Sequence, residues 1–395
     1  MKSEWKKIKA KDFIEFNPKI TLKKGTVSKK IAMDKLSPFS KKIYDYEISS
    51  YSGGTKFCND DTIMARITPC LENGKTAYID FLEDDEVAFG STEFIVLRAK
   101  KGISNSQFIY YLSISPKFRD IAIKSMVGSS GRQRVQQSVL EELELIVPPL
   151  KEQEKIGAFL KNIDDKIELN QQINNNLEQQ AQAIFKRWLS ENSGNYTFIP
   201  LYEIALINPD NYSINENWKH ISYLDTSSIT NGVIGEIQSI NPQIDKLPSR
   251  AKRKIKNKDI VYSTVRPNQR HFGIITNPSS DMLVSTGFAV IRSMCEKVSN
   301  ELIYLHITNN DFIEKMQQLA EQSTSTFPSI KPSDLGSCLI PCPNNESGIR
   351  LNEHLKSVYN MISCNNEQNN ELAKLRDTLL PKLMSGEIDI SNIEF

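Results

Sequence analysis

The residue types that usually build metal and redox sites are scarce in this sequence. Among its 395 residues there are six cysteines and four histidines, with no CxxC pair and no histidine pair at metal-ligand spacing. Scattered reduced thiols are therefore the favoured interpretation of the cysteines. A zinc site at Cys338 and Cys342, with His354 as the nearest histidine, is the weaker alternative.

Long hydrophobic runs are also missing. No apolar stretch approaches the length needed to cross a membrane, and the start MKSEWKKIKAKDF has no signal-peptide core. We therefore expect a cytoplasmic protein with no membrane partner. Hydrophobic content of 39% and charged content of 25% are typical of a globular chain, and 395 residues are too many for one ordinary core.

Motifs of familiar catalytic sites are incomplete. LENGKTAYI contains the end of a phosphate-binding loop, but Pro69 stands where the first glycine of that loop is required. NPDNY resembles an amino-methyltransferase motif, yet Asp210 replaces its second proline, and a matching Asn17–Pro18 favours a structural turn. We expect no catalytic residue, no metal and no cofactor in this chain.

The chain repeats one plan. NNNLEQQAQAIFKRWLS (174–190) matches NNELAKLRDTLLPKLMS (369–385), 195 residues later. STEFIVLR (91–98) matches STGFAVIR (285–292), 194 residues later, and loop insertions would explain the drift in offset. Each copy comprises a globular segment, a proline-rich hinge and a long helix.

This repeat predicts two similar globular domains and two long helices. The domains are expected at residues 1–148 and 193–343, and the helices at 149–192 and 344–395, the last range including the C-terminal tail. β-rich runs such as TIMARI, EFIVLR and DIVYSTV, each followed further on by helical periodicity, predict a mixed α/β (α+β) fold.

Both predicted long helices carry an apolar stripe that requires a partner helix, and the obvious partner is the other copy. The resulting antiparallel pair, with pseudo-twofold symmetry, would hold two domains apart, since the first helix spans roughly 60 Å. Such a spacing suits a split DNA site, because DNA repeats about every 34–36 Å. The inter-helix or partner-binding residues are Ile156, Leu160, Ile163, Ile167, Leu177, Ile184, Trp188, Leu351, Leu355, Val358, Ile362, Leu372 and Leu379.

Two features interrupt these stripes. Asparagines cluster at 170–176 and 365–370, either buried to fix the helix register or lying on a polar exposed face. Pro381 in the second helix is expected to kink it or end it early.

Positive charge is distributed unevenly along a chain whose formal net charge is only +1. RAKRKIKNK (250–258) contains six basic side chains and no acid, which favours a phosphate-facing patch over a solvated surface.

Four segments carry a resemblance to a known family. They are TPCLENGKTA (68–77), VYSTVRPNQRHFGI (261–274), IVPPLKEQEKIGAFLKNIDDKIELNQ and LLPKLMSGEI (379–388). Together they closely resemble the specificity subunit of type I restriction–modification systems, over essentially the whole chain.

The resemblance implies a non-catalytic subunit with two target recognition domains, each reading one half of a bipartite site in double-stranded DNA. It also implies that the long helices separate these domains and dock two modification (methyltransferase) subunits, with restriction (translocase/nuclease) subunits joining the larger complex. S-adenosylmethionine, ATP and Mg are then expected on the partner subunits.

Candidate DNA contacts were chosen by residue type and position. Arg, Asn and Gln can pair with base edges, and small polar loops beside arginine suit phosphates. An ordinary mobile surface loop is the alternative for the loop residues. The candidates are Lys29, Lys30, Thr68, Asn73, Lys75, Ser129, Arg132, Gln133, Arg134, Arg250, Lys252, Arg253, Lys254, Arg266, Asn268, Gln269, Arg270, His271, Ser323 and Thr324.

Two other functions stay open at the level of sequence. One is a helical scaffold that joins proteins without recognising DNA. The other is a divergent DNA methyltransferase, which would have to bind S-adenosylmethionine by itself.

Overall fold

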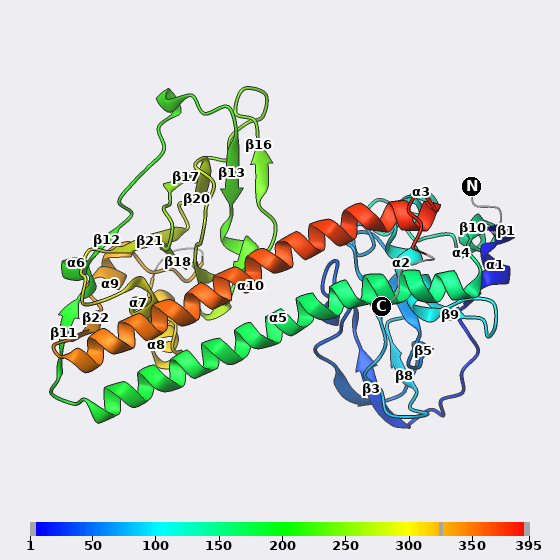
Figure 1. Ribbon diagram of the computed structural model, residues 1–395, viewed down its shortest axis with the longest axis horizontal. Helices are drawn as coiled ribbons and strands as arrows, with labels where there is room; N and C mark the ends of the chain where they lie inside the picture. The colour runs from blue at the N-terminus through cyan, green and yellow to red at the C-terminus, as the bar shows by residue number, and fades with distance from the viewer. Residues whose placement is uncertain (1–4, 324–326, 391–395) are drawn as a thin grey trace. The chain divides into compact units, whose positions relative to one another are not determined.

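The computed structural model describes residues 5–323 and 327–390. The chain divides into two compact units, and many of their elements are labelled in Figure 1. Unit 1 comprises residues 1–170 and 368–395, and unit 2 comprises residues 171–367.

The two long helices are shared between the units. Helix α5 (Leu150–Glu191) has 42 residues and helix α10 (Glu346–Ser385) has 40. The first part of α5 and the last part of α10 belong to unit 1, and their remaining parts belong to unit 2. In unit 1 the two helix segments run antiparallel. Asp164 of α5 contacts Arg376 of α10, whereas Asn170, further along α5, contacts Asn369, which comes earlier in α10.

Unit 1 contains a two-stranded sheet and two four-stranded sheets. The two-stranded sheet pairs β1 with β10, sheet A1 has the order β2-β9-β6-β7, and sheet B1 has the order β4-β3-β8-β5. Strands β3 and β8 run parallel, and the other paired strands of this unit run antiparallel. The elements are β1 (Lys6–Lys9), α1 (Ala10–Phe13), β2 (Ile14–Phe16), β3 (Val27–Ile31), η1 (Met33–Lys35), β4 (Glu47–Ser50), β5 (Thr55–Phe57), β6 (Thr62–Ala65), β7 (Thr76–Tyr78), β8 (Ala88–Gly90), β9 (Phe94–Ala99), α2 (Ser106–Ile114), α3 (Pro116–Lys124), α4 (Gln137–Glu141) and β10 (Glu144–Val147).

Unit 2 has the same topology. It pairs β11 with β22, sheet A2 has the order β12-β21-β18-β19, and sheet B2 has the order β16-β13-β20-β17 with β13 and β20 parallel. The hairpin β14–β15 is an addition to this plan. The elements are β11 (Tyr196–Pro200), α6 (Leu201–Ile204), β12 (Ala205–Ile207), η2 (Ile214–Glu216), β13 (Ile221–Leu224), η3 (Thr226–Ser228), β14 (Ile229–Thr230), β15 (Val233–Ile234), β16 (Gln238–Ile240), β17 (Ala251–Lys254), β18 (Ile260–Ser263), η4 (Pro267–Gln269), β19 (Phe272–Ile274), β20 (Met282–Ser285), β21 (Phe288–Ser293), α7 (Asn300–Ile307), α8 (Asn310–Glu321), α9 (Pro332–Gly336) and β22 (Leu339–Pro343).

The mixed α/β fold and the internal repeat predicted from the sequence are thus confirmed. The repeat extends to single turns. Asn17 and Asn208 both adopt a left-handed backbone, with φ of 47° and 55°. The side-chain oxygen of each accepts a 2.9 Å hydrogen bond from a backbone N–H of the neighbouring strand, of Val96 and Val290 respectively. The Asn–Pro pairs are therefore structural turns.

Strand β9 shows why the A sheets are central to each unit. Phe94 and Val96 lie in the core shared with sheet B1, whereas Ile95 and Leu97 lie in the core shared with helix α2. Successive side chains of a strand point to opposite faces, so an unbroken apolar run is buried on both. Strand β21 divides its residues between two cores in the same alternating way.

Both units also contain a buried arginine–aspartate pair at equivalent strands. Arg98 donates two 2.7 Å hydrogen bonds to the carboxylate of Asp61, which is 0% exposed. Arg292 donates to Asp259 at 2.8 and 2.7 Å, and Asp259 is likewise 0% exposed. These carboxylates raise the pKa of both guanidinium groups above its ordinary value.

The asparagine clusters of the long helices are partly buried at the helix seam. Asn170 is 1% exposed and donates to the side-chain oxygens of Gln368 at 2.7 Å and of Asn369 at 2.8 Å in unit 1. In unit 2 the amide of Asn174 exchanges 2.8 Å hydrogen bonds with Asn366 and Asn365. Because buried amides demand partners, these pairs favour one register of the helices. Of the two alternatives that the sequence leaves open, a buried position or a polar exposed face, Asn170 and Asn369 take the buried one.

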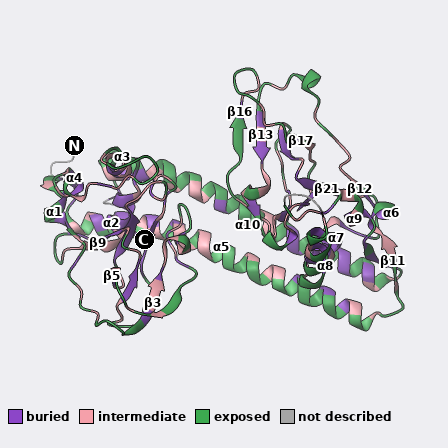
Figure 2. Ribbon diagram, turned by 180° about the vertical axis from the view of Figure 1, so that it is seen from behind, coloured by how far each residue is buried: buried purple, intermediate pink, exposed green. Residues whose placement is uncertain are grey.

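Buried and half-buried residues alternate with exposed ones along α5 and α10 (Figure 2). Most stripe residues pack into the cores of the units rather than only against the other helix. Ile184 is 38% exposed and lies outside these cores. Buried stripe residues are Ile156, Leu160, Ile163, Trp188, Leu351, Leu355 and Val358, and half-buried ones are Ile167, Leu177, Ile362, Leu372 and Leu379.

Of the two outcomes expected for Pro381, a kink or an early end of the second helix, the early end does not occur. Helix α10 continues past it to Ser385. A proline removes one helical hydrogen bond and crowds the preceding turn. Leu380 and Leu383, on either side of it, are 4% and 0% exposed in the core of unit 1, and this packing keeps the last turn helical.

Lys41 is a buried lysine in unit 1. It is 7% exposed, and its ammonium donates to Gln107 Oε1 at 2.6 Å. The rings of Tyr78, Tyr110 and Tyr111 surround it at 5.3, 5.4 and 5.0 Å. Burial lowers the pKa of Lys41 to about 8, and nearby Asp164 opposes this shift.

This environment predicts a pH dependence of stability. A lysine whose pKa is lower in the folded chain binds fewer protons when folded, so the stability of unit 1 rises with pH from about 8 toward 10.5. The expected slope reaches roughly 1.4 kcal/mol per pH unit. Urea unfolding between about pH 7.5 and 9.5, below the ordinary tyrosine pKa, measures it.

Two variants test whether Lys41, rather than a neighbouring group, causes this pH dependence of stability. Lys41→Met should flatten the rise, whereas Lys42→Met should preserve it, because the adjacent Lys42 is ion-paired with Asp80 at 2.5 Å and its pKa is raised. Equal slopes in Lys41→Met and the unmodified chain would contradict the assignment. The groups facing Lys41 from α5 include Lys161, Asp164 and Asp165.

Candidate nucleic-acid interface

In each unit two distant segments, both predicted as DNA contacts, meet beside sheet A. In unit 1 the turn after β6 bonds to the loop before α4: the Thr68 N–H donates to the Gln133 carbonyl at 3.0 Å. In unit 2 the turn after β18 bonds to the loop before α9: the Arg266 N–H donates to the Pro328 carbonyl at 2.9 Å. The two turns occupy equivalent places in the repeated topology.

The turn of unit 2 presents two polar side chains on a constrained backbone. Arg266 and Arg270 flank the short helix η4 and both have left-handed φ, 48° and 56°. Such conformations are uncommon for residues other than glycine and cluster at functional sites. Between them Asn268 and Gln269 are exposed. These are the residue types that pair with adenine edges.

Helix α8 supports this turn. Arg270 Nη2 donates to Asn310 Oδ1 at 2.8 Å, and the Asn268 N–H donates to Gln317 Oε1 at 3.3 Å. The arrangement fixes the backbone of η4 through contacts with residues 40 to 49 positions later. Sequence reasoning missed Asn310 and Gln317, because no local pattern marks them.

The guanidinium group of Arg266 lies 4.6 Å from the ring centre of Phe327, which is 53% exposed. Unit 1 has a similar pair: the guanidinium of Arg119 lies 4.9 Å from the ring of Phe39, which is 63% exposed, and Arg119 donates to the Glu72 carbonyl at 2.7 Å. Stacked arginines remain charged and accessible on one face. Phe39, Arg119 and Phe327 were absent from the sequence prediction.

His271 is half-buried beside the same turn. Its Nδ1 lies 2.6 Å from the Ile229 carbonyl and 3.1 Å from Thr230 Oγ1. A carbonyl can only accept, so Nδ1 carries the proton and, in the neutral ring, Nε2 keeps a lone pair. The extra hairpin β14–β15 thus positions His271.

The turn of unit 1 has a different chemistry. Thr68 Oγ1 donates to Glu72 Oε1 at 2.9 Å, and Lys75 Nζ donates to the Met33 carbonyl at 2.9 Å. Both side chains therefore already form hydrogen bonds within unit 1. Asn73 is exposed and presents its amide to solvent.

The adjoining loop of unit 1 exposes Ser129 and Arg132, while Gln133 is half-buried. Arg134 was predicted as a phosphate contact, but it is paired with Glu93 at 2.6 Å. Hydrogen bonding between them raises the pKa of Arg134 and lowers that of Glu93. The charge of Arg134 is thus compensated within the protein.

The equivalent loop of unit 2 contains Ser323, which is half-buried and accepts a 3.3 Å hydrogen bond from the Ser329 N–H. Thr324 lies outside the described residues.

The basic cluster at 250–258 does not form one free patch. Lys254 is ion-paired with Glu216 and lies 5.2 Å from the ring of Trp218. Lys258 is paired with Glu301 at 3.1 Å. Intramolecular partners therefore remove two of the six charges from the expected surface.

The other four members of the cluster differ in burial. Arg253 is half-buried, its Nε has no hydrogen-bond partner among the described residues, and burial lowers its pKa. Arg250, Lys252 and Lys256 are exposed and form no ion pair within the described part of the chain. These three constitute the free basic surface.

Lys29 and Lys30 are consecutive residues of strand β3, so their side chains point to opposite faces of sheet B1 and have different partners. Lys29 is paired with Glu86 at 2.7 Å, and its side chain is only 12% exposed. Lys30 is paired with Glu47 at 2.9 Å, with side chains 39% and 48% exposed. Exposed pairs of this kind contribute little stability, so Lys30 can exchange its partner.

Within residues 5–323 and 327–390, no group of three or more His, Cys, Asp or Glu side chains could hold a metal ion. The six cysteines are unpaired. None of the helices in the described ranges is long and apolar enough to cross a membrane.

Comparisons with known proteins agree with this architecture. The profile of the type I restriction modification DNA specificity domain matches residues 2–179. The specificity subunit of the type I restriction enzyme MjaVIII of Methanocaldococcus jannaschii is 21% identical over 334 residues, covering 77% of this chain and 75% of that protein. The chain is therefore similar to the specificity subunits of type I restriction–modification systems over most of its length.

Other relatives match less completely. The specificity subunit of the type I restriction enzyme HindI of Haemophilus influenzae is 25% identical over 162 residues, so this chain spans about a third, 35%, of that protein. The crystal structure of a type I restriction–modification system S subunit from M. genitalium aligns over 97% of both chains with a TM-score of 0.53 and 15% identity. That likeness shows a shared fold.

Proposed function

We propose that this chain is a non-catalytic DNA-binding subunit that reads a bipartite sequence, one half with each unit. The observation that carries the proposal is the turn repeated beside sheets A1 and A2. One topology presents Asn268 and Gln269 in unit 2 but Asn73 in unit 1. A shared scaffold with different polar side chains suits the recognition of two different half-sites.

We also propose the partners of this chain, and these rest on its resemblance to type I specificity subunits. The chain would direct two modification subunits, which methylate DNA with S-adenosylmethionine, and restriction subunits, which use ATP and Mg. It would bind none of these cofactors itself. The exposed side chains of α5 and α10, including Ile184, are available for such subunits.

The test is a map of methylated adenines. The chain would be co-expressed with its modification subunit in a host that lacks DNA methylation. A split motif with a fixed gap, present only when this chain is expressed, is the expected result. Co-purification of the two proteins without any motif would instead favour a scaffold, and S-adenosylmethionine binding by the chain alone would favour a methyltransferase.

The free basic surface of unit 2 gives a prediction about affinity. Replacing Arg250, Lys252 and Lys256 together with glutamine should weaken binding to all DNA sequences alike, because phosphate contacts carry no base information. If each contacts one phosphate, the slope of log affinity against log salt becomes shallower by about 2.7. Fluorescence anisotropy with duplex DNA at several salt concentrations measures the slope.

Lys254→Gln is the control for this triple variant, because Glu216 already neutralises Lys254 and the slope should hardly change. A slope unaffected by the triple variant would remove the cluster from the DNA interface.

A further inference from the structure

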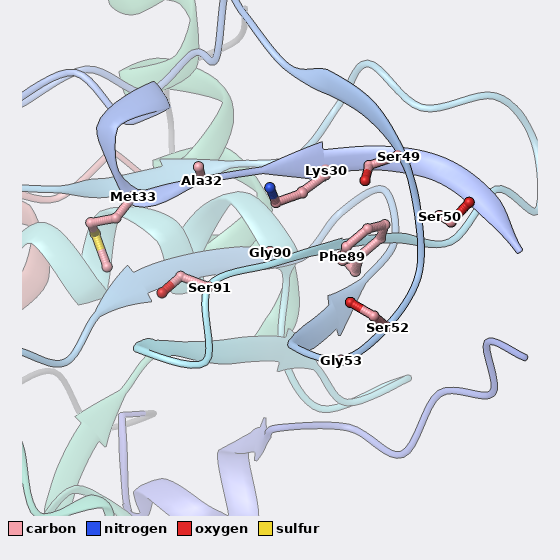
Figure 3. A pocket seen from close by; sticks show the side chains of 10 residues that line it. All are labelled: Lys30, Ala32, Met33, Ser49, Ser50, Ser52, Gly53, Phe89, Gly90 and Ser91. Carbon is pink, nitrogen blue, oxygen red and sulfur yellow. The ribbon is translucent and has the colours of Figure 1, made fainter. Parts of the chain in front are cut away.

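Unit 1 contains a pocket of about 310 Å³ on sheet B1, which no sequence motif marks (Figure 3). The residues that line it include Lys30 and four serines, Ser49, Ser50, Ser52 and Ser91. No carboxylate lines it. Figure 3 shows Lys30, Ser49 and Ser52 gathered around the ring of Phe89.

The register of sheet B1 explains why Lys30 and Phe89 share one face. Across the four strands, Glu47 pairs with Lys30, Lys30 with Phe89, and Phe89 with Lys56. Directly opposed residues of neighbouring strands point to the same side of a sheet. Two lysines therefore flank Phe89 on the pocket face, and Glu47 compensates only one of them. Lys56 has no carboxylate partner within the described residues.

Glycines shape the floor of the pocket. A Cβ at Gly90 would lie 2.4 Å from the Ile31 carbonyl oxygen, and one at Gly54 would lie 2.1 Å from the Gly90 carbonyl oxygen. Any side chain at either position would force the strands apart. The close approach of Gly90 in β8 to Ile31 and to Gly54 thus depends on the absence of side chains at the two glycines.

Unit 2 has different chemistry at the same register. Its equivalent row pairs Gln238 with Tyr223, Tyr223 with Leu283, and Leu283 with Lys254. Tyr223 takes the place of Lys30, and its hydroxyl donates to Asp225 Oδ1 at 2.8 Å. The ammonium group at the centre of the row belongs to unit 1 alone.

We infer that this pocket of unit 1 binds a phosphate group of the DNA backbone, next to the half-site that unit 1 reads. Hydroxyl donors and an ammonium group suit phosphate oxygens, and a concave site suits a protruding phosphate better than a base edge. Lys30 leaves Glu47, an exposed partner, to do so. The inference rests on the proposed DNA binding and assigns the pocket a positioning role.

The test compares charge and hydroxyl variants of the complete complex with its modification subunit on duplex DNA. Lys30→Gln should make the slope of log affinity against log salt shallower by about 0.9, one phosphate contact. Ser52→Ala should weaken binding roughly 2- to 10-fold without changing that slope, because it removes a hydrogen bond and no charge. Neither change should alter the methylated motif.

Lys101→Gln is the matched control, since Lys101 is exposed in the turn after β9 and its loss removes the same charge. Its slope should equal that of the unmodified chain. Thermal unfolding of all variants verifies folding, which Lys30, 39% exposed at its side chain, should tolerate.

Three results would overturn the inference. The first is an unchanged slope in Lys30→Gln while the unmodified complex binds DNA normally. The second is a changed base preference in one half of the motif, which would assign the pocket to base reading. The third is Lys30-dependent broadening of the ³¹P signal of inorganic phosphate without any effect on DNA, which would indicate a free-phosphate site. No DNA binding by the unmodified complex would instead refute the proposed function.

Discussion

Replacing Asp259 with alanine should destabilise unit 2 by about 3–5 kcal/mol, the usual effect of removing one partner from a buried ion pair. The Asp259 carboxylate is 0% exposed and receives two hydrogen bonds from Arg292 and a third, at 2.7 Å, from the Lys256 N–H. Its loss leaves the Arg292 guanidinium, whose side chain is 18% exposed, with only Asp210 as a charged partner.

Urea unfolding, followed by the fluorescence of Trp188 and Trp218, measures this effect in unit 2. Glu296→Ala is the control, because Glu296 is exposed and its loss should change stability by less than about 0.5 kcal/mol. Asp61→Ala should destabilise unit 1 comparably, since the Asp61–Arg98 pair repeats the arrangement. A loss below about 1 kcal/mol for Asp259→Ala would mean that the pair does not anchor sheet A2.

Replacing Asn268 and Gln269 together with alanine should erase base preference in one half of the methylated motif and leave the other half and the gap intact. Each bidentate contact to a base contributes about 1–3 kcal/mol of discrimination, so the preferred base should lose roughly a 5- to 150-fold advantage at each position read. Both side chains are exposed, and their truncation should not affect folding.

Methylation mapping with the double variant measures this effect directly. Gln318→Ala, at an exposed position of α8, is the control and should leave the motif unchanged. Asn73→Ala should alter the opposite half-site, because Asn73 lies on the equivalent turn of unit 1. An unaltered motif in the Asn268/Gln269 variant would exclude η4 from base reading, and changes in both halves would contradict independent recognition by two units.

Much of the architecture was accessible from the sequence because it depends on local and repeated patterns. The run EFIVLR predicts a strand, and its repeat in the second copy predicts a second domain of the same plan. The long helices follow from helical periodicity over segments with few breakers. The family resemblance rests on the same repeated segments. The early end considered for the second helix at Pro381 does not occur, since Leu380 and Leu383 are packed in the core of unit 1 and this packing outweighs the local preference of proline.

The choice among charged candidates was decided by tertiary structure. Arg134 and Lys254 read as free cations in the sequence, yet Glu93 and Glu216 neutralise them from 41 and 38 residues away. The stacking of Arg266 on Phe327 and the support of η4 by α8 also join segments that are far apart along the chain. The pocket on sheet B1 depends on strand register, which sets Lys30 beside Phe89.

The sequence by itself therefore determined the repeated α/β plan and the long helices, because periodicity and propensity act over a few neighbouring residues. Only the tertiary structure decided which polar side chains remain available to a partner. That outcome depends on pairwise distances between residues far apart in the chain, because a charge with an opposite charge folded beside it is compensated within the protein unless the pair is exposed and can exchange.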